Sequence, residues 1–193
     1  MSNNNMIKKE IDELIKILNA IPALEKDINL ATEKIFQCLK SNKKILICGN
    51  GGSAAEANHL AAEFIVRLKP SNNRNALPII SLCQNSSVLT ACGNDIGFEN
   101  IFSRSLEALG SEGDVLIALS TSGKSKNILN VLDVSKKKKI ISISLLGKDG
   151  GAAKSLSDIN ITMPSNDVAR IQECHLFLGH HIFGEVEKKL FNF

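Results

Sequence analysis

The sequence contains no tryptophan and no tyrosine, and eight phenylalanines are its only aromatic hydrophobic residues among 193. Proteins that stack nucleic-acid bases or sugar rings on aromatic side chains need a richer supply of such rings. The sequence also lacks a large excess of one charge, because 23 basic residues against 20 acidic ones leave a formal net charge of +3. A protein built to hold nucleic acid carries a stronger basic excess. We therefore expect no nucleic-acid partner.

Cysteine is sparse and poorly placed for cross-linking. The cysteines are odd in number, widely scattered and free of any C-x-x-C pair: Cys38, Cys48, Cys83, Cys92 and Cys174. This pattern excludes a disulfide framework or a structural zinc knuckle and indicates reduced thiols. The first ten residues lack the apolar core of a signal peptide. No run approaches the roughly 18 apolar residues of a membrane span, so we expect a cytoplasmic protein with no membrane partner.

What the chain does contain is 44% hydrophobic residues, enough for the core of one ordinary domain. Apolar residues recur at helical spacing from Ile11 onward, Pro22 predicts a break, and a second helix follows to about Lys40. Little in the domain is predicted to cover the apolar faces of these helices, so subunit packing is a natural use for them. We expect a single domain over residues 1–193, whose helical segment over about 1–41 serves oligomerisation.

After this segment, short apolar runs alternate with helical patterns. The runs predict buried strands at residues 43–49, 78–82, 113–120, 139–147 and 157–163. Helices are predicted after Ser53, over 124–134 and over 168–191. Such alternation gives right-handed crossover units and an α/β fold: a three-layer, doubly wound, five-stranded parallel sheet preceded by N-terminal helices. Ligands in such folds bind beyond the carboxyl ends of the strands.

The first candidate ligand loop is Gly49-Asn50-Gly51-Gly52-Ser53-Ala54, directly after the first predicted strand. It matches G-x-G-x-x-A, a loose form of the dinucleotide fingerprint that is weak by itself. The second predicted strand ends L-C-Q-N, without the acidic residue that holds a ribose, and a Walker lysine is absent. A nucleotide is therefore disfavoured. Three glycines within four positions exceed the needs of a tight turn and indicate that a ligand approaches the backbone closely.

The second candidate loop is Ser120-Thr121-Ser122-Gly123-Lys124-Ser125, directly after the third predicted strand. Free N–H groups and the helix dipole favour an anion at the helix N-terminus that follows. A plain N-cap is the alternative, but an N-cap needs one hydroxyl residue and this loop has four. The pattern therefore indicates a phosphate monoester, which presents several acceptor oxygens. Lys124 either adds charge to the site or is simply solvated.

Two polar sets lie on predicted helices, the first of which begins at the glycine loop of residues 49–54. His59 and Glu63 are four residues apart and share a helical face, for which an ordinary surface ion pair is the alternative. On the last helix, Gln172 and His180 are about two turns apart and lie on broadly the same side of an otherwise apolar helix. Spacing alone does not choose between these and three neighbouring candidates: Glu173, His175 and His181.

Two imidazoles, a carboxylate and a carboxamide have two chemical uses. They can hold zinc or a similar divalent ion through nitrogen and oxygen. A carboxylate and an imidazole can also act as base and acid in an aldose–ketose isomerisation. One group removes a proton next to the carbonyl, the other protonates the carbonyl oxygen, and an enediol forms. Positioned proton transfer of this kind is worth ~10²–10⁴-fold in rate.

Together these residues resemble a known family. The motifs that carry the resemblance are C-G-N-G-G-S, A-C-G-N-D, F-S-R-S-L-E-A-L-G, G-D-V-L-I-A-L-S-T-S-G-K-S, L-L-G-K-D-G-G and A-R-I-Q-E-C-H. They are similar to the sugar isomerase (SIS) family and, more narrowly, to its phosphoheptose isomerases. The resemblance implies a cytoplasmic homotetramer with active sites between subunits. It also implies conversion of sedoheptulose 7-phosphate to D-glycero-D-manno-heptose 7-phosphate, the first step towards the ADP-heptose of bacterial surface polysaccharides.

The resemblance assigns roles residue by residue. It implies substrate contacts from the two candidate helices, the first loop and the A-C-G-N-D motif: Asn50, Gly51, Gly52, Ser53, Glu63, Asn94, Asp95 and Gln172. The phosphate would be held by Ser120, Thr121, Ser122 and Ser125. Glu63 would be the base and His180 the acid. One zinc ion per subunit would bind His59, Glu63, Gln172 and His180.

Two features complicate this transfer of roles. Glu63 and His180 cannot bind a metal and move protons freely at the same time. Either the metal is partly structural, or the ligands exchange roles when substrate binds. Some family members also carry aspartate directly before the R-I-Q-E motif, where this chain has Ala169. Asp167 is close by, but the sequence gives no reason to assume that it substitutes.

Three rival functions share the same fold. A non-catalytic relative that binds the bacterial replication initiator keeps the loops but lacks the glutamate and the last-helix histidine, whereas this chain has Glu63 and His180. The same two residues argue, less strongly, against a sensor of sugar phosphates. Isomerases of arabinose 5-phosphate usually carry extra domains for which this chain has no room. The run Lys136–Lys139 is interpreted as a lysine-rich helix C-terminus rather than a nucleic-acid site.

Overall fold

The computed structural model describes residues 4–192 and is built around a five-stranded sheet. Every neighbouring pair of strands is parallel, and the strand order is β2-β1-β3-β4-β5. The strands are β1 (Ile45–Gly49), β2 (Ile79–Ser81), β3 (Val115–Ser120), β4 (Ile141–Gly147) and β5 (Ile159–Met163). Each lies inside a run that predicted it, so the five strands and the parallel sheet are confirmed.

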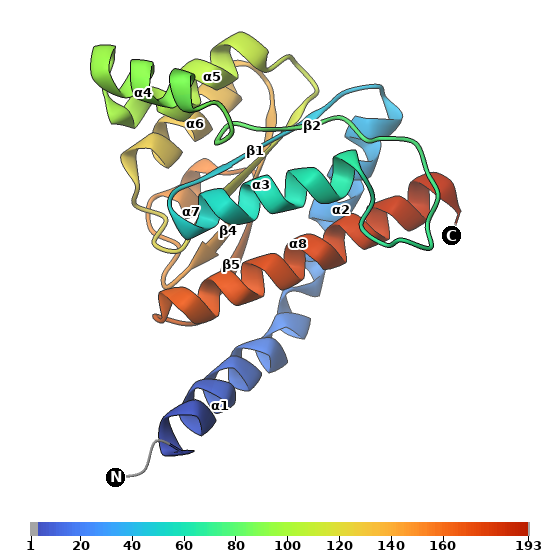
Figure 1. The fold of residues 1–193 in the computed structure, drawn as a ribbon, viewed down its shortest axis with the longest axis vertical. Helices are drawn as coiled ribbons and strands as arrows, with labels where there is room; N and C mark the ends of the chain where they lie inside the picture. The colour runs from blue at the N-terminus through green and yellow to red at the C-terminus, as the bar shows by residue number, and fades with distance from the viewer. Residues whose placement is uncertain (1–3, 193) are drawn as a thin grey trace.

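Helices cover both faces of the sheet and make three layers (Figure 1). One face packs against α2 (Glu25–Lys40), α3 (Gly52–Ile65) and α8 (Val168–Phe191). The other packs against α5 (Ile101–Leu109) and α6 (Lys126–Lys137). The predicted doubly wound α/β architecture is therefore confirmed, and α8 has the bounds that its periodicity predicts.

Strand β1 shows why the strands appear in the sequence as continuous apolar runs. Successive side chains of a strand point to opposite faces of the sheet. Ile45 and Ile47 are buried in the core beneath α3 and α8, whereas Leu46 and Cys48 are buried in the core beneath α5 and α6. Because both faces are covered, no position of the strand faces solvent, and β1 ends at the sheet edge where ligands bind.

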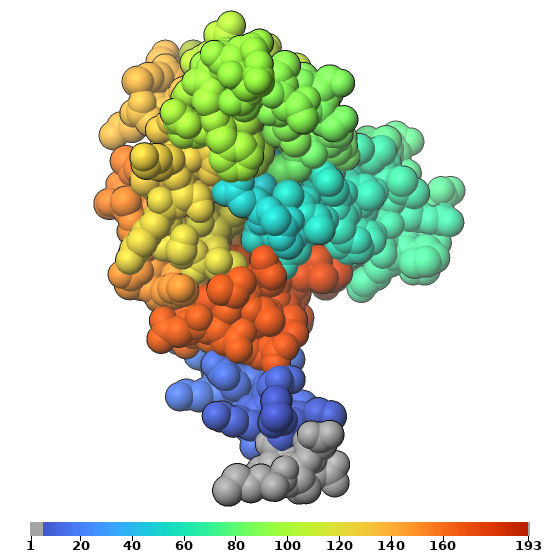
Figure 2. Space-filling view, turned by 60° about the vertical axis from the view of Figure 1, so that its left-hand side comes forward, coloured from blue at the N-terminus to red at the C-terminus, as the bar shows by residue number. Residues whose placement is uncertain are grey.

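Helix α1 (Asn4–Ala20) projects away from the body of the domain, as Figures 1 and 2 show. A 3-10 turn, η1 (Ile21–Leu24), contains Pro22 and separates α1 from α2, so the predicted break at the proline is confirmed. Several apolar side chains of α1 are 48–63% exposed: Ile7, Ile11 and Ile15. These uncovered side chains suit the oligomerisation that the sequence predicts for this segment, which stays a prediction.

The chain between β2 and β3 forms helices for which the sequence patterns gave no prediction. These are α4 (Ser86–Asp95) and η2 (Phe98–Asn100), followed by α5. Helix α4 buries only Cys92 among its side chains, so its apolar periodicity is faint. A short helix, α7 (Ala153–Leu156), was also not predicted. None of the described helices combines the length and apolarity needed to cross a bilayer.

Candidate active and metal site

The site lies along the contact between α3 and α8, which run side by side on one face of the sheet (Figure 1). Gly179 of α8 lies against Leu60 of α3, because a Cβ atom on this glycine would come within 2.6 Å of both terminal carbons of Leu60. One turn further along, the rings of Phe64 and Phe183 pack with their centroids 3.7 Å apart. A glycine opposite a leucine lets two helices approach closely. The side chains that flank this contact are therefore brought together.

The residues beside that contact are His59 and His180, whose Nε2 atoms lie 2.8 Å apart. Glu63 places its Oε1 atom 3.6 Å from the same His59 nitrogen. One potential ligand atom from each residue lies within 4.8 Å of the others, and we call the three residues the triad. They line a groove of about 570 Å³. His59 and Glu63 are therefore not an isolated surface ion pair, because His180 from another helix converges on them.

The electrostatics of the triad favour a metal ligand set. Burial lowers the pKa of His180, and the neighbouring His59 lowers it further. A histidine with a lowered pKa is neutral near pH 7, and the neutral imidazole is the form that binds a metal. Two imidazole nitrogens and one carboxylate oxygen are typical ligands of catalytic zinc sites that keep a coordination position open. The triad therefore fits a divalent ion such as zinc.

Gln172, the fourth ligand implied by the resemblance, lies against the start of α3. Its carboxamide packs on Gly52, where an added Cβ atom would come within 2.6 Å of Nε2. The same Nε2 donates a hydrogen bond of 3.4 Å to Ser53 Oγ. Within residues 4–192, Gln172 makes no hydrogen bond to the triad. The structure thus brings Gln172 to the glycine loop, and its role as a metal ligand stays a prediction.

The competing candidates on α8 have other surroundings. His175 is 1% exposed, its Nε2 donates a hydrogen bond to the Leu146 carbonyl oxygen, and burial lowers its pKa to about 4. It is therefore a core histidine of α8 that hydrogen-bonds to strand β4. Glu173 is exposed and pairs with Arg170. His181 is exposed and lines the groove, but it is not part of the triad. The structure therefore selects His180 among the histidines of this helix.

The glycine loop, residues 49–54, leaves the carboxyl end of β1. Gly51 has a φ of +55°, a left-handed conformation that glycine adopts without strain. The side-chain amides of Asn50 and Asn127 exchange two hydrogen bonds, of 2.9 and 2.8 Å. Asn127 is 2% exposed and lies in the first turn of α6. Asn127 thus links the glycine loop to the start of α6 by hydrogen bonds. The sequence analysis did not predict this contact. The place of Asn127 directly after the second loop was the available signal.

The serine loop, residues 120–125, leaves the neighbouring strand β3 and is shaped by its own hydroxyl groups. Ser120 Oγ accepts a hydrogen bond of 3.0 Å from the N–H of Gly123. Ser122 Oγ accepts one of 3.2 Å from the N–H of Lys124. Each hydroxyl keeps its own O–H free to donate, because only its lone pairs are used in these bonds. The loop is therefore held in shape while its donors stay available to an anion.

The rest of the serine loop is fixed by its neighbours. Gly123 has a φ of +61°, and an added Cβ atom would overlap the Gly150 carbonyl oxygen. Ser125 is the N-cap residue of α6, but its side chain makes no capping hydrogen bond. The plain N-cap interpretation is therefore wrong for this residue. Lys124 pairs at the surface with Asp149 over 3.7 Å, which favours the solvated alternative for the lysine.

In the described part of the chain, neither Asn94 nor Asp95 makes a hydrogen bond to the triad. Both are exposed near the end of α4, where Asn94 Nδ2 donates a hydrogen bond of 2.7 Å to Asp95 Oδ1. Their implied contact with substrate stays a prediction. At the start of α8, Asp167 Oδ1 accepts hydrogen bonds from the N–H groups of Ala169 and Arg170. Asp167 therefore serves as the helix cap.

One acidic residue beside the glycine loop was missed in the sequence. Glu56 lies on α3, three residues before His59. Burial raises its pKa to about 7, against the lowering effect of a hydrogen bond with Ser53. Its Oε2 atom is buried without a hydrogen-bond partner in the described part of the chain. Glu56 is therefore mostly protonated below neutral pH, unlike an exposed glutamate.

Comparison with known proteins first shows which domain family the chain matches. The family model described as SIS domain matches residues 11–147, more than half of the chain. Among curated proteins, the phosphoheptose isomerase of Clostridium acetobutylicum is 46% identical over 96% of this chain and 93% of its own length. Phosphoheptose isomerase 1 of Campylobacter jejuni is 49% identical over 91% of this chain and 94% of its own length.

Solved structures agree with these relatives. The phosphoheptose isomerase of Neisseria gonorrhoeae superposes with a TM-score of 0.90 at 35% identity, over 97% of this chain and all of that one. A phosphoheptose isomerase of Francisella tularensis gives a TM-score of 0.92 at 31% identity with the same coverage. The chain therefore belongs to the phosphoheptose isomerase group of the SIS-domain family, and the resemblance identified in the sequence is confirmed.

Proposed function

We propose that the protein is an aldose–ketose isomerase that converts sedoheptulose 7-phosphate into D-glycero-D-manno-heptose 7-phosphate. This reaction begins the route to ADP-heptose, which bacteria use in surface polysaccharides such as lipopolysaccharide and capsule. One observation carries the proposal: the triad converges between α3 and α8, and the N-terminus of α3 is the glycine loop. Relatives that match over nearly the whole chain are named for this activity.

In this proposal the two loops bind and orient the sugar phosphate. The serine loop holds the phosphate through hydroxyl groups and the N-terminus of α6, which favours an anion: Ser120, Thr121, Ser122 and Ser125. Further substrate contacts come from Asn50, Gly51, Gly52, Ser53, Asn94, Asp95 and Gln172. The Asn50–Asn127 amide pair supports a fixed spacing between the two loops. The sugar then extends from the serine loop towards α3.

The proton transfers fall to Glu63 and His180. Glu63 removes a proton from C1 of the ketose. The protonated form of His180, which is the minor form near pH 7 because its pKa is lowered, gives a proton to the carbonyl oxygen at C2, which produces an enediol. Glu63 then returns its proton to C2, and His180 takes the proton from the hydroxyl at C1, which leaves the aldose. Both side chains line one groove. His180 Nε2 lies 2.8 Å from His59 Nε2, and Glu63 Oε1 lies 3.6 Å from the same nitrogen. Their return to the starting protonation state closes the cycle.

We propose one zinc ion per subunit as the cofactor, held by His59, Glu63 and His180 with Gln172 as the fourth ligand. The donor types and the convergence of the triad support this choice. When bound, zinc would polarise the substrate carbonyl and stabilise the negative charge that develops on its oxygen. Glu63 and His180 would then alternate between holding the ion and moving protons. The chain's activity should therefore depend on which ion is supplied.

We also propose that the protein is a cytoplasmic homotetramer, as the resemblance implies. The exposed apolar side chains of α1 support an assembly, because a soluble chain gains by covering them: Met6, Ile7, Ile11 and Ile15. An assembly would also give Asn94 and Asp95 a way to reach a neighbouring subunit's site. Sedimentation of the purified chain tests the assembly, and a monomer at micromolar concentration would refute it.

The function is tested by following sedoheptulose 7-phosphate in D₂O by NMR, with added zinc and with a chelator. We expect the wild type to form the aldose and Glu63→Gln to lose at least ~10²-fold in rate. Glu173→Gln is the matched control, because Glu173 is an exposed glutamate of α8 that pairs with Arg170. If the wild type leaves the ketose unchanged under all metal conditions, the isomerase is refuted. A sensor or a partner of another protein would then be the better interpretation of the loops.

A further inference from the structure

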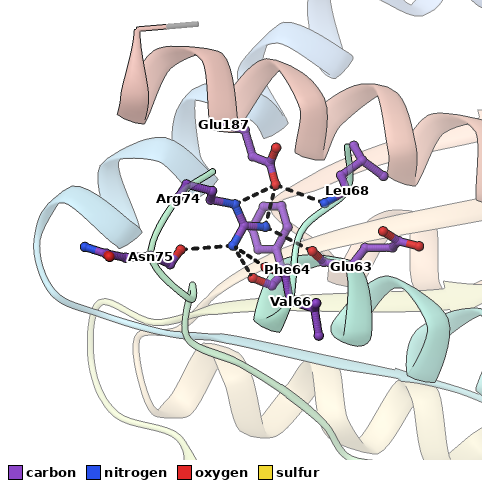
Figure 3. A network of polar contacts seen from close by, with 7 residues as sticks. All are labelled: Glu63, Phe64, Val66, Leu68, Arg74, Asn75 and Glu187. Atoms are coloured by element: carbon purple, nitrogen blue, oxygen red, sulfur yellow. Dashed lines mark hydrogen bonds and ion pairs between the residues drawn. The ribbon is translucent and has the colours of Figure 1, made fainter. Parts of the chain in front are cut away.

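The side chain of Arg74 has no contact with solvent. Arg74 lies in the irregular segment between α3 and β2, and its side chain is 0% exposed. Burying a guanidinium group is costly unless its charge and its N–H groups are all matched by partners. Figure 3 shows that the partners come from two directions, the C-terminal end of α3 and the facing side of α8. The triad does not include this arginine, and neither candidate loop contacts it.

On one side, Arg74 binds the backbone at the end of α3. Its Nη2 donates a hydrogen bond of 3.0 Å to the carbonyl oxygen of Glu63, and its Nη1 donates one of 2.8 Å to that of Phe64. Carbonyl groups in the last turn of a helix lack partners within the helix, and a cation there complements the helix dipole. Arg74 therefore fixes the backbone of Glu63, the residue proposed as the base.

On the other side, Arg74 binds Glu187 of α8, whose side chain is 1% exposed. Nε donates a hydrogen bond of 2.8 Å to Glu187 Oε1, and Nη2 donates a second bond to the same oxygen. Glu187 follows His180 by seven residues, about two helical turns, so the two lie on the same face of α8. One guanidinium group thus links the backbone of Glu63 to the face of α8 that carries His180 (Figure 3).

This link supplies a directional contact between α3 and α8, which the apolar contacts between these helices cannot supply. The Leu60–Gly179 and Phe64–Phe183 contacts set how near α3 and α8 lie. Apolar contact is non-directional and permits small sliding along the helix axes. A planar guanidinium fork fixes direction and register. A buried ion pair also adds little stability over an apolar pair of similar volume, so register is the property that it contributes.

We propose that Arg74 and Glu187 form a positioning clamp that sets the register of α3 against α8 and so holds His59 and Glu63 in line with His180. The clamp touches neither substrate nor metal. Its expected consequence for catalysis rests on the isomerase function proposed above, whereas its consequence for metal binding depends only on the geometry of the triad. The two are therefore measured separately.

The main test is the double variant Arg74→Met/Glu187→Met, which replaces the clamp with an apolar pair and avoids a lone buried charge. Zinc affinity is measured by competition with a chromophoric chelator, at a temperature where thermal melting shows the variant to be fully folded. We expect the zinc Kd to rise by about 10–100-fold, as for outer-shell residues of metal sites. We also expect kcat to fall more than KM changes. Zinc affinity and kcat within twofold of the wild type would overturn the proposal.

Two further variants keep the result interpretable. Arg74→Lys keeps the charge but loses the fork, and it replaces the double variant if the latter does not fold. A zinc Kd raised at least threefold in this variant supports the clamp, and an unchanged zinc Kd refutes it. Lys44→Met/Asp114→Asn is the matched control, because it also removes both charges of an ion pair with a buried carboxylate, away from the triad. It should leave the zinc Kd of the folded protein unchanged. A wild type that binds zinc but does not isomerise would refute the function and leave this test intact.

Discussion

Replacing Gly179 with alanine tests whether the close approach of α3 and α8 builds the triad. The new methyl carbon would lie 2.6 Å from both Cδ atoms of Leu60, whereas carbon atoms in contact prefer about 3.5–4.0 Å. Relief by backbone movement requires the helices to separate by roughly 1 Å. His59 and His180 flank this contact, so the separation would pull apart Nε2 atoms that now lie 2.8 Å from each other.

We expect Gly179→Ala to change the free energy of unfolding only slightly but to lower zinc affinity and activity strongly. Overpacking costs about 1–3 kcal/mol, and the gain in helix propensity from glycine to alanine returns about 1 kcal/mol. The free energy of unfolding should therefore fall by only about 0–2 kcal/mol, or roughly 0–8 °C in Tm for a chain of this size. A displacement of about 1 Å in a preorganised site can cost ~10²-fold in activity. The zinc affinity should fall by at least about tenfold.

The assay compares Gly179→Ala with Gly179→Ala/Leu60→Ala. Zinc Kd is measured by chelator competition and Tm by thermal melting of the metal-free protein. The double variant removes the methyl groups that collide with the new Cβ, so it should recover zinc affinity even though the loss of Leu60 lowers Tm. If Gly179→Ala binds zinc as tightly as the wild type, the close approach at this contact is not what brings the imidazoles together. Failure of the double variant to recover affinity would contradict the steric explanation.

Two further predictions concern the half-buried Glu56 and the tightly packed Gly123 of the serine loop. Glu56 has a folded pKa of about 7 against an ordinary value of 4.5, so the folded state binds more protons in this window and stability falls as pH rises through it. Glu56→Gln should therefore raise the free energy of unfolding at pH 8 by about 1–2 kcal/mol, after allowance for partial solvation of the group, and change it little near pH 4.5. Gly123→Ala combines a φ of +61° with overlap of the Gly150 carbonyl oxygen, so it should destabilise the protein by at least about 2 kcal/mol. It should also raise the KM for the sugar phosphate, because the serine loop must move. Urea denaturation and steady-state kinetics check these expectations.

Each of these two predictions, for Glu56→Gln and for Gly123→Ala, has an outcome that would contradict it. A stabilisation by Glu56→Gln that is as large at pH 4.5 as at pH 8 would show that the ionised carboxylate is not the source of the cost. A Gly123→Ala variant with unchanged stability would show that the contact with Gly150 relaxes easily. An unchanged KM in a destabilised Gly123→Ala variant would show that the conformation of the serine loop does not control its proposed binding of phosphate.

The sequence was most informative where the signal is local. Strands buried on both faces appear as continuous apolar runs, and each predicted run contains its strand. The period of α8 predicts its bounds from Val168 to Phe191. Helix α4 escaped prediction because only Cys92 among its side chains is buried, so the apolar periodicity is faint. Helix α5 was missed although Phe102 and Leu106 share a face and are buried, a signal that the sequence did contain.

The candidate site was predictable in its parts. Glycines and hydroxyl residues at the carboxyl ends of two strands indicated ligand loops, because that edge of a parallel sheet binds ligands whatever the details of packing. Spacing could not choose between His175, His180 and His181, since three residues so close on one helix differ only in direction. The structure distinguishes them by burial and contact: the first is a core histidine and the second meets His59.

By itself, the sequence determined the order of the five strands along the chain, the two candidate ligand loops and the chemistry that their residue types permit. The tertiary structure decided which side chains meet. His59 and His180 are 121 residues apart, and Arg74 and Glu187 are 113 apart. Their meeting depends on how α3 packs against α8, which a glycine opposite Leu60 makes close and a buried guanidinium holds in register. Periodicity reports the face of one helix, whereas a site built by two helices requires their mutual distance and rotation, which only packing sets.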